Sequence, residues 1–176
     1  CYMAAVESKI IKNFFDKDEL NLLQKYCYNR LDKNTDWRID EQSFSPAWYS
    51  DPLMSAMLST KLSKVEKESG LTLLPTYAYW RYYVFGGSLD KHIDRPACEV
   101  SITVCIKKYD DWPIIIEDKS FELLEGEALL YPGHEAYHWR PGVYEGEGMA
   151  QLFMHYIDKN GPYTEHAYDQ YELSQI

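Results

Sequence analysis

The hydrophobic positions of residues 1–75 recur mostly at helical spacing. Asp16 followed three residues later by Glu19 is a capping-box pattern, and it predicts a helix start. A second helix is predicted with Asp51 as its N-cap, Pro52 in its first turn and Gly70 at its end. The segment between them, residues 32–50, is predicted to be a long loop or flap that carries Trp37, Trp48 and Tyr49. The apolar stripes of the two helices are Leu20, Leu23, Cys27 and Leu31, and then Met54, Leu58, Leu62 and Val65.

The pattern changes to that of β-strands from Leu71 onward. The run from Tyr77 to Phe85 is almost entirely β-branched or aromatic and ends at Gly86-Gly87. Turn-forming pairs such as Glu125-Gly126 separate later apolar runs. No helical pattern follows Gly70, which argues against a parallel α/β sheet. The predicted strands are 71–74, 77–85, 88–93, 98–107, 113–117, 121–124, 127–131, 136–140 and 149–157.

Many short strands after two helices predict a mainly β fold, a barrel or a double-sheet jelly roll with the helices against one outer face. We find no internal repeat and no Gly/Ser-rich linker, so we predict a single domain over residues 1–176. Within it, residues 1–75 form the helical support, 76–158 the β core and 159–176 a C-terminal tail.

Charge and composition exclude several classes of partner. The 176 residues carry a formal net charge of −10, which disfavours nucleic acid as a ligand. No run of about 18 apolar residues is present to span a membrane, and the N-terminus has no export-signal pattern. The scattered residues Cys1, Cys27, Cys98 and Cys105 fit reduced, mostly buried thiols, with Cys98 and Cys105 on opposite sides of one strand. We therefore expect a cytoplasmic protein with neither nucleic-acid nor membrane partners.

The candidate chemistry lies at His92, Asp94 and His138. Residues i and i+2 of a strand point to the same face, so His92 and Asp94 would project together into the interior. Two imidazoles and one carboxylate form the facial arrangement that non-haem Fe(II) oxygenases use. A His-x-Asp pair alone is weak evidence, because such short patterns are common.

The surrounding sequence resembles the 2-oxoglutarate- and Fe(II)-dependent dioxygenases, and among them the prolyl-4-hydroxylase-like branch. The stretch YVFGGSLDKHID, residues 83–94, looks like the family's aromatic strand and Gly-Gly turn leading into His-x-Asp. The stretch EGEALLYPG, residues 125–133, looks like the strand and turn before the distal histidine, and HWR, residues 138–140, like that histidine's own strand. The resemblance covers roughly residues 77–158 and depends on order and spacing.

This resemblance implies a double-stranded β-helix, of the jelly-roll or cupin-like type. It also implies Fe(II) bound by His92, Asp94 and His138, with 2-oxoglutarate as cosubstrate and O₂ as oxidant, and hydroxylation of a C–H bond with release of succinate and CO₂. The substrate implied is a peptidyl residue, for instance proline, although a small molecule fits a chain of this size almost as well.

The cation for the distal carboxylate of 2-oxoglutarate departs from the family pattern. The family usually places an Arg or Lys some ten residues beyond the distal histidine, and here residues 145–148, Glu-Gly-Glu-Gly, offer none. Arg140 is our first candidate, because it would share the inward face of His138. Arg81 and Lys107 are the alternatives, and Tyr83 is predicted to donate a hydrogen bond to the same carboxylate. A structural salt bridge to Glu145 or Glu147 is the competing interpretation of Arg140.

Two other interpretations remain open. The first is a cupin-like metal-dependent enzyme or binding protein that does not use 2-oxoglutarate. The second is a β-barrel interaction module without catalytic activity. Of the remaining histidines, His134 competes with His138 for the distal position but follows a Pro-Gly turn, His155 is predicted in the core, and His166 is expected in solvent.

Overall fold

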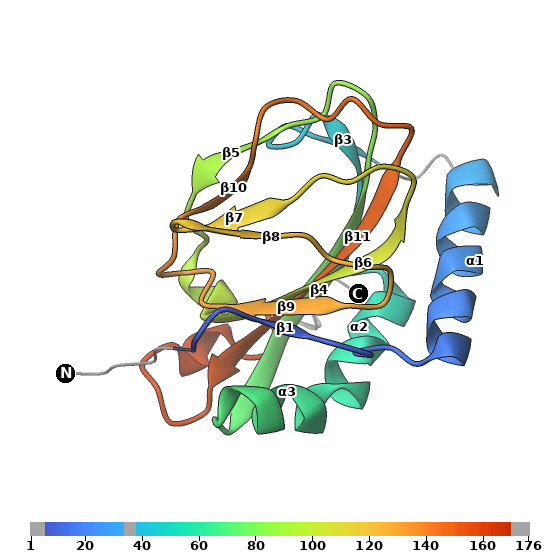
Figure 1. Cartoon of the computed structure of the whole chain (residues 1–176). Coiled ribbons are helices and arrows are strands. Elements are labelled where there is room, and N and C mark those ends of the chain that lie inside the picture. Colours follow the sequence, from blue (N-terminus) through green and yellow to red (C-terminus); the bar gives the residue numbers. More distant parts are fainter. Residues whose placement is uncertain (1–5, 34–37, 170–176) are drawn as a thin grey trace.

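The computed structural model describes residues 6–33 and 38–169, and its core is a pair of antiparallel β-sheets (Figure 1). The larger sheet contains β1 (Lys9–Ile11), β2 (Arg38–Asp40), β3 (Ser45–Tyr49), β4 (Leu73–Tyr83), β6 (Val100–Lys108), β9 (Ala128–Tyr131) and β11 (Met149–Asp158). The smaller sheet contains β5 (Leu89–His92), β7 (Ile114–Ile116), β8 (Lys119–Phe121) and β10 (His138–Arg140). The strand orders are β1-β9-β6-β11-β4-β3-β2 and β5-β10-β7-β8. This arrangement confirms the mainly β prediction.

Three helices cover the outer face of the larger sheet: α1 (Lys17–Lys33), α2 (Pro52–Thr60) and α3 (Leu62–Ser69). The capping box is present, since Glu19 N donates to Asp16 Oδ1 at 2.8 Å and Asp16 N donates to Glu19 Oε1 at 3.0 Å. Asp51 caps α2, and Gly70 ends α3 with φ of 74°, a left-handed conformation that favours glycine. The predicted single second helix was wrong in one respect, because it is interrupted at Lys61.

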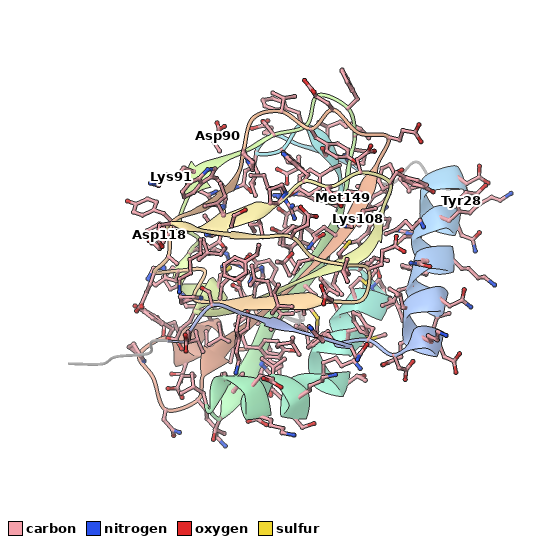
Figure 2. All side chains as sticks on the ribbon, viewed as in Figure 1. Tyr28, Asp90, Lys91, Lys108, Asp118 and Met149 are labelled. Carbon is pink, nitrogen blue, oxygen red and sulfur yellow. The ribbon has the colours of Figure 1, made fainter. Side chains whose placement is uncertain are left out.

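Side chains along the long strands of the larger sheet point alternately to its two faces, and each face is buried in a different interior. On β4, Ala78 and Trp80 face the helices, while Tyr79 and Arg81 face the smaller sheet. The helix side is apolar, with both aliphatic and aromatic residues, and it includes Leu58 and many other fully buried side chains. The space between the sheets holds one cluster of mainly aliphatic residues around Ile116 and Leu129 and, beside it, aromatic and polar side chains. Figure 2 shows all side chains, with Met149 inside and Tyr28 on α1. The polar side chains between the two sheets are therefore the candidates for a functional site.

Three predictions for the chain's path were wrong. The predicted flap contains a β-hairpin, β2–β3, because β3 pairs with β4 and Trp48 stacks on Trp80 with ring centroids 3.9 Å apart. Trp37 lies outside the described residues. The strands predicted at 71–74 and 77–85 are one strand, β4, and the one predicted at 121–124 lies earlier, as β8.

The cysteine prediction was wrong in one detail. Cys98 lies in the 3-10 segment η1 (Pro96–Cys98) and not in the strand of Cys105, so the two thiols do not share a strand. Cys27, Cys98 and Cys105 are all buried and free, whereas Cys1 lies outside the described residues. Among the described helices, none is both long and apolar enough to cross a membrane.

Candidate metal centre

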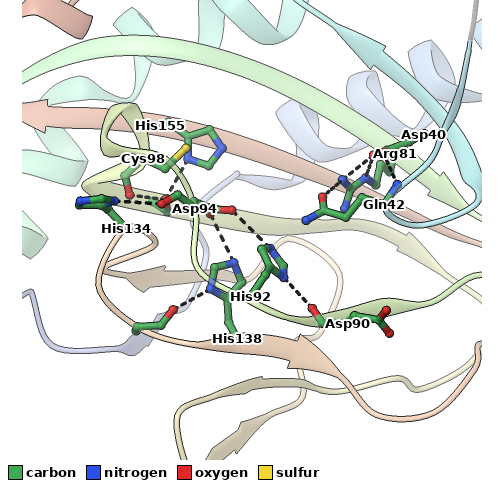
Figure 3. A network of polar contacts seen from close by, with 12 residues as sticks. Asp40, Gln42, Arg81, Asp90, His92, Asp94, Cys98, His134, His138 and His155 are labelled. Carbon is green, nitrogen blue, oxygen red and sulfur yellow. Dashed lines mark hydrogen bonds and ion pairs between the residues drawn. The ribbon is translucent and has the colours of Figure 1, made fainter.

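The smaller sheet places two histidines side by side. His92 ends β5 and His138 begins β10, and the two residues are direct partners in the antiparallel pairing of these strands. Their ring centroids lie 4.3 Å apart. Asp94 lies beyond the end of β5, and its backbone N–H donates to Gly133 O at 2.9 Å, which holds the loop beside β10. Two strand ends and one loop therefore converge on one point (Figure 3).

The three side chains offer ligand atoms at metal-binding distances. One nitrogen from each of His92 and His138 and one oxygen from Asp94 all lie within 4.8 Å of one another. The Nε2 atoms of His92 and His138 each lie 3.3 Å from a different oxygen of Asp94. His138 is almost completely buried, whereas the side chains of His92 and Asp94 are each 21% exposed, so the site opens to solvent on one side.

Backbone carbonyls fix the tautomer of both imidazoles. His92 Nδ1 lies 2.6 Å from Asp90 O, and His138 Nδ1 lies 2.9 Å from Ala136 O. Because a carbonyl oxygen only accepts hydrogen bonds, each Nδ1 carries the proton. Each Nε2 is thereby left to act as a ligand, which is the arrangement of metal-binding histidines in proteins.

The electrostatics of the metal-free site favour a charged carboxylate. Burial raises the pKa of Asp94, but the hydrogen bonds from His138 and His92 outweigh burial and hold that pKa well below its usual range. Burial lowers the pKa of His92, and the contacts with Asp94 and the Asp90 carbonyl reverse this, so its pKa lies above the ordinary value. The metal-free site thus holds an ionised Asp94, and a metal ion would take the place of the extra proton that the raised pKa favours on His92.

Arg81 lines the same small cavity as these three residues, together with aromatic side chains such as Tyr79. Its guanidinium is 1% exposed and is already held by the hairpin, since Nε donates to Asp40 Oδ2 and NH2 donates to Gln42 Oε1, both at 2.6 Å. NH1 donates to Tyr83 Oη at 3.3 Å. The cation that lines the triad cavity is therefore neutralised by Asp40.

Arg140 faces inward, as its spacing from His138 predicted, but it lines a different cavity. That cavity also contains Gln151 and Trp112. The Arg140 guanidinium stacks over the rings of Tyr83 and Trp112 at 5.4 and 5.3 Å, and NH1 donates to Trp112 O. In the part of the chain that the structure describes, Arg140 Nε and Gln151 Oε1 are buried without hydrogen-bond partners. No ion pair to Glu145 or Glu147 forms between described atoms.

The remaining candidates are placed as follows. Lys107 lies away from the triad, in a hollow beside α1, and forms a 3.2 Å ion pair with Glu125. It faces outward because a register irregularity at Ala150–Gln151 shifts the pairing of β6 with β11. Tyr83 is fully buried between the two arginines, and its hydroxyl accepts from Arg81.

The other histidines have separate environments. His134 lies in the turn before β10, and its Nδ1 is 2.9 Å from Asp94 O. His155 is buried on β11, where its Nδ1 is 2.8 Å from Ser101 Oγ. His166 is only partly buried, in the 3-10 segment η2 (Thr164–His166). The sequence analysis did not identify Asp40 and Gln42 as partners of Arg81, or Gly133 as the residue that holds the loop of Asp94. Of these three, only Gly133 could have been noticed, because it belongs to a Pro-Gly turn.

Comparison with known proteins identifies the fold. No protein-family model matches the chain, and no curated protein matches it by sequence. A prolyl-4-hydroxylase from Pseudomonas putida superposes with a TM-score of 0.69 at 12% identity, covering 87% of this chain and 93% of that one. A 2OG-Fe(II) oxygenase-family oxidoreductase from Burkholderia pseudomallei gives 0.67 at 12% identity, covering 88% and 85%.

A third structure carries ligands. HygX from Streptomyces hygroscopicus, with nickel, 2-oxoglutarate and hygromycin B bound, gives a TM-score of 0.68 at 10% identity, covering 87% of this chain and 83% of that one. At these identities the likeness concerns the fold. The chain therefore has the fold of the 2-oxoglutarate- and Fe(II)-dependent oxygenases, the double-stranded β-helix that the sequence resemblance implied.

Proposed function

We propose that this chain is an Fe(II)- and 2-oxoglutarate-dependent oxygenase that hydroxylates a C–H bond and releases succinate and CO₂. His92, Asp94 and His138 would hold the iron. The observation that carries the proposal is the convergence of their three ligand atoms, with both imidazoles oriented through Nδ1. Two nitrogens and one carboxylate oxygen suit Fe(II) and leave neighbouring coordination positions open.

The bound iron would supply the activation of O₂, and the protein's own side chains do the rest. Asp94 offsets part of the metal's charge, and the two backbone carbonyls hold the imidazole rings in place. The aromatic residues Tyr79, Tyr131 and Phe153 line the cavity and would limit the access of water from their side of the reacting centre.

For the distal carboxylate of 2-oxoglutarate we retain Arg140, assisted by Tyr83. Arg140 is a buried cation whose Nε has no partner among the described residues, so a carboxylate there would satisfy an otherwise unpaired donor. The Tyr83 hydroxyl accepts from Arg81 and still has its own proton to donate. Arg81 is the less suitable choice, because a ligand carboxylate would have to displace Asp40.

Thermal-shift measurements with Mn(II), 2-oxoglutarate and the inert analogue N-oxalylglycine test the proposal. We expect stabilisation by Mn(II), and a further increase with either dicarboxylate only when Mn(II) is present. His92→Ala, Asp94→Ala and His138→Ala should each remove both effects, whereas His166→Ala, which lies outside the site, should keep them. Full metal-dependent stabilisation in all three triad variants would reject the proposal.

The cosubstrate assignment has its own test. Arg140→Ala should weaken 2-oxoglutarate binding by about 10- to 100-fold, the loss expected for a charged hydrogen bond, and leave Mn(II) binding intact. The matched variant Arg81→Ala should weaken 2-oxoglutarate binding clearly less than Arg140→Ala does. If Arg81→Ala and not Arg140→Ala weakens the cosubstrate, the assignment passes to Arg81.

A metal-dependent enzyme of the cupin type that does not use 2-oxoglutarate is the second candidate. It is favoured by one observation, the neutralisation of Arg81, the cation that lines the triad cavity, by Asp40. Stabilisation by Mn(II) without any response to 2-oxoglutarate would support this candidate and reject the first.

For the substrate we propose a peptidyl residue, such as proline, or a small molecule. The structural neighbours include a prolyl-4-hydroxylase and a protein with bound hygromycin B, so both classes occur on this fold. Succinate release in the presence of candidate peptides and metabolites would identify which class this chain accepts.

A further inference from the structure

The turn that leads into β10 holds the backbone of Asp94 at both of its polar groups. The Asp94 N–H donates to Gly133 O at 2.9 Å, and the Asp94 carbonyl lies 2.9 Å from His134 Nδ1. Because a carbonyl only accepts, the His134 ring must donate this bond from a protonated Nδ1. Figure 3 shows His134 directed at Asp94 from the side opposite to His92 and His138.

The turn is itself attached to a third segment. His134 N donates to Cys98 O at 3.1 Å, and the hydroxyl of Ser101 donates to the same carbonyl at 3.1 Å. A Cβ on Gly133 would lie 2.5 Å from Ser101 Oγ and 2.9 Å from Asp94 Oδ2. Only glycine leaves room for the Asp94 carboxylate to lie this close to the turn. The loop of Asp94 is thus packed against a fixed support.

The His134 ring has a second contact. It packs edge-on against Tyr163, with ring centroids 5.2 Å apart. The hydrogen bond to Asp94 and the contact with Tyr163 together fix the orientation of the His134 ring. Here they aim one nitrogen at the main chain of a candidate metal ligand, in the way that outer residues orient ligands at metal centres.

We propose that His134 is a positioning residue for the metal centre. By fixing the carbonyl of Asp94, it sets the direction in which the Asp94 carboxylate leaves the backbone, and so maintains the distances to His92 and His138. This inference depends on the proposed metal site and assigns to His134 no contact with metal or substrate.

The test is the dissociation constant for Mn(II), measured by electron paramagnetic resonance of the free ion, alongside the melting temperature of the metal-free protein. His134→Ala should weaken Mn(II) binding by about 10- to 100-fold, the usual effect of losing an outer hydrogen bond at a metal site. His134→Phe keeps a ring against Tyr163 but has no donor, and should weaken binding equally. His134→Asn places an amide N–H near the position of Nδ1 and should restore most of the affinity.

The pattern across the variants separates positioning from simple structural support. A structural role would follow ring packing, so Phe would rescue and Asn would not, and that result overturns the proposal. Unchanged Mn(II) binding in His134→Ala also overturns it. Asp94→Ala and His166→Ala serve as the matched controls. If the wild-type protein fails to bind Mn(II), or if Asp94→Ala binds it as tightly as the wild type, the proposed metal site is rejected together with the role of His134. If the wild type binds Mn(II) and Asp94→Ala does not, a failure of the His134 variants to behave as expected rejects the role of His134 alone.

Discussion

His155 should make the protein sensitive to mild acid. Its side chain is 1% exposed, and burial lowers the pKa to about 4 from the ordinary 6.5. Because the folded-state pKa lies below the unfolded value, the contribution to stability is complete above 6.5 and is lost as the pH falls toward 4. One pKa unit corresponds to about 1.4 kcal/mol, so between about pH 7 and about pH 4.5 this one group should remove about 2 to 3 kcal/mol from the free energy of unfolding.

Urea unfolding of the metal-free protein, followed by tryptophan fluorescence at the two pH values, measures this loss. His155→Phe keeps the ring that packs 4.6 Å from Tyr77, and His155→Gln keeps a polar group for Ser101. Neither replacement titrates in this range, so both variants should lose about 2 to 3 kcal/mol less than wild type over the same interval. Equal losses in wild type and both variants would show that His155 is protonated in the folded state without cost, and would refute the reasoning.

Three further outcomes are expected. Gly133→Ala places a methyl group 2.9 Å from a carboxylate oxygen of Asp94. It should weaken Mn(II) binding, as measured by calorimetry, and lower the free energy of unfolding by about 1 to 3 kcal/mol, as measured by denaturation. Asp51→Ala removes a buried helix cap that also accepts a hydrogen bond from Tyr26 at 2.5 Å, and it should lower the free energy of unfolding in urea by about 2 to 4 kcal/mol. Asp16→Ala, at the exposed cap of α1, should lower it by only about 1 kcal/mol, and equal losses in the two variants would contradict this reasoning. The raised pKa of His92 means that Mn(II) must displace a proton from this imidazole, so the Mn(II) affinity measured by titration should fall as the pH decreases, beginning above pH 6.5. A pH-independent affinity would contradict a protonated His92 in the metal-free protein.

The helices and most strands could be predicted because their signals are local. The Asp16 capping box, the Asp51 cap and the Gly70 stop are each set by a few neighbouring residues, and all three are present in the structure. The β2–β3 hairpin was missed because nothing local marks it, and Pro46 argues against a strand. Its stability comes from pairing with β4 and from the stack of Trp48 on a ring more than thirty residues away.

The candidate site was predicted by a partly incorrect argument. We expected His92 and Asp94 to share a strand face, whereas β5 ends at His92 and Asp94 belongs to a loop. The two side chains still meet, because Gly133 holds that loop by a backbone hydrogen bond and offers no Cβ to keep the carboxylate away. Spacing therefore identified the residues, and a contact between distant segments sets their geometry. That the three bind iron stays a prediction.

The binding site of the distal carboxylate shows where sequence reasoning reaches its limit. Alternation places both Arg81 and Arg140 on inward faces, so periodicity cannot choose between them. What separates them is the number of donors already satisfied: Asp40 and Gln42 occupy Arg81, while Arg140 keeps an unpaired buried Nε. Asp40 and Gln42 lie on and beside the very hairpin that the sequence did not predict. An error in one edge strand thus extends to the choice of cosubstrate residue, because a buried cation can bind a ligand only with the donors that the fold has left unused.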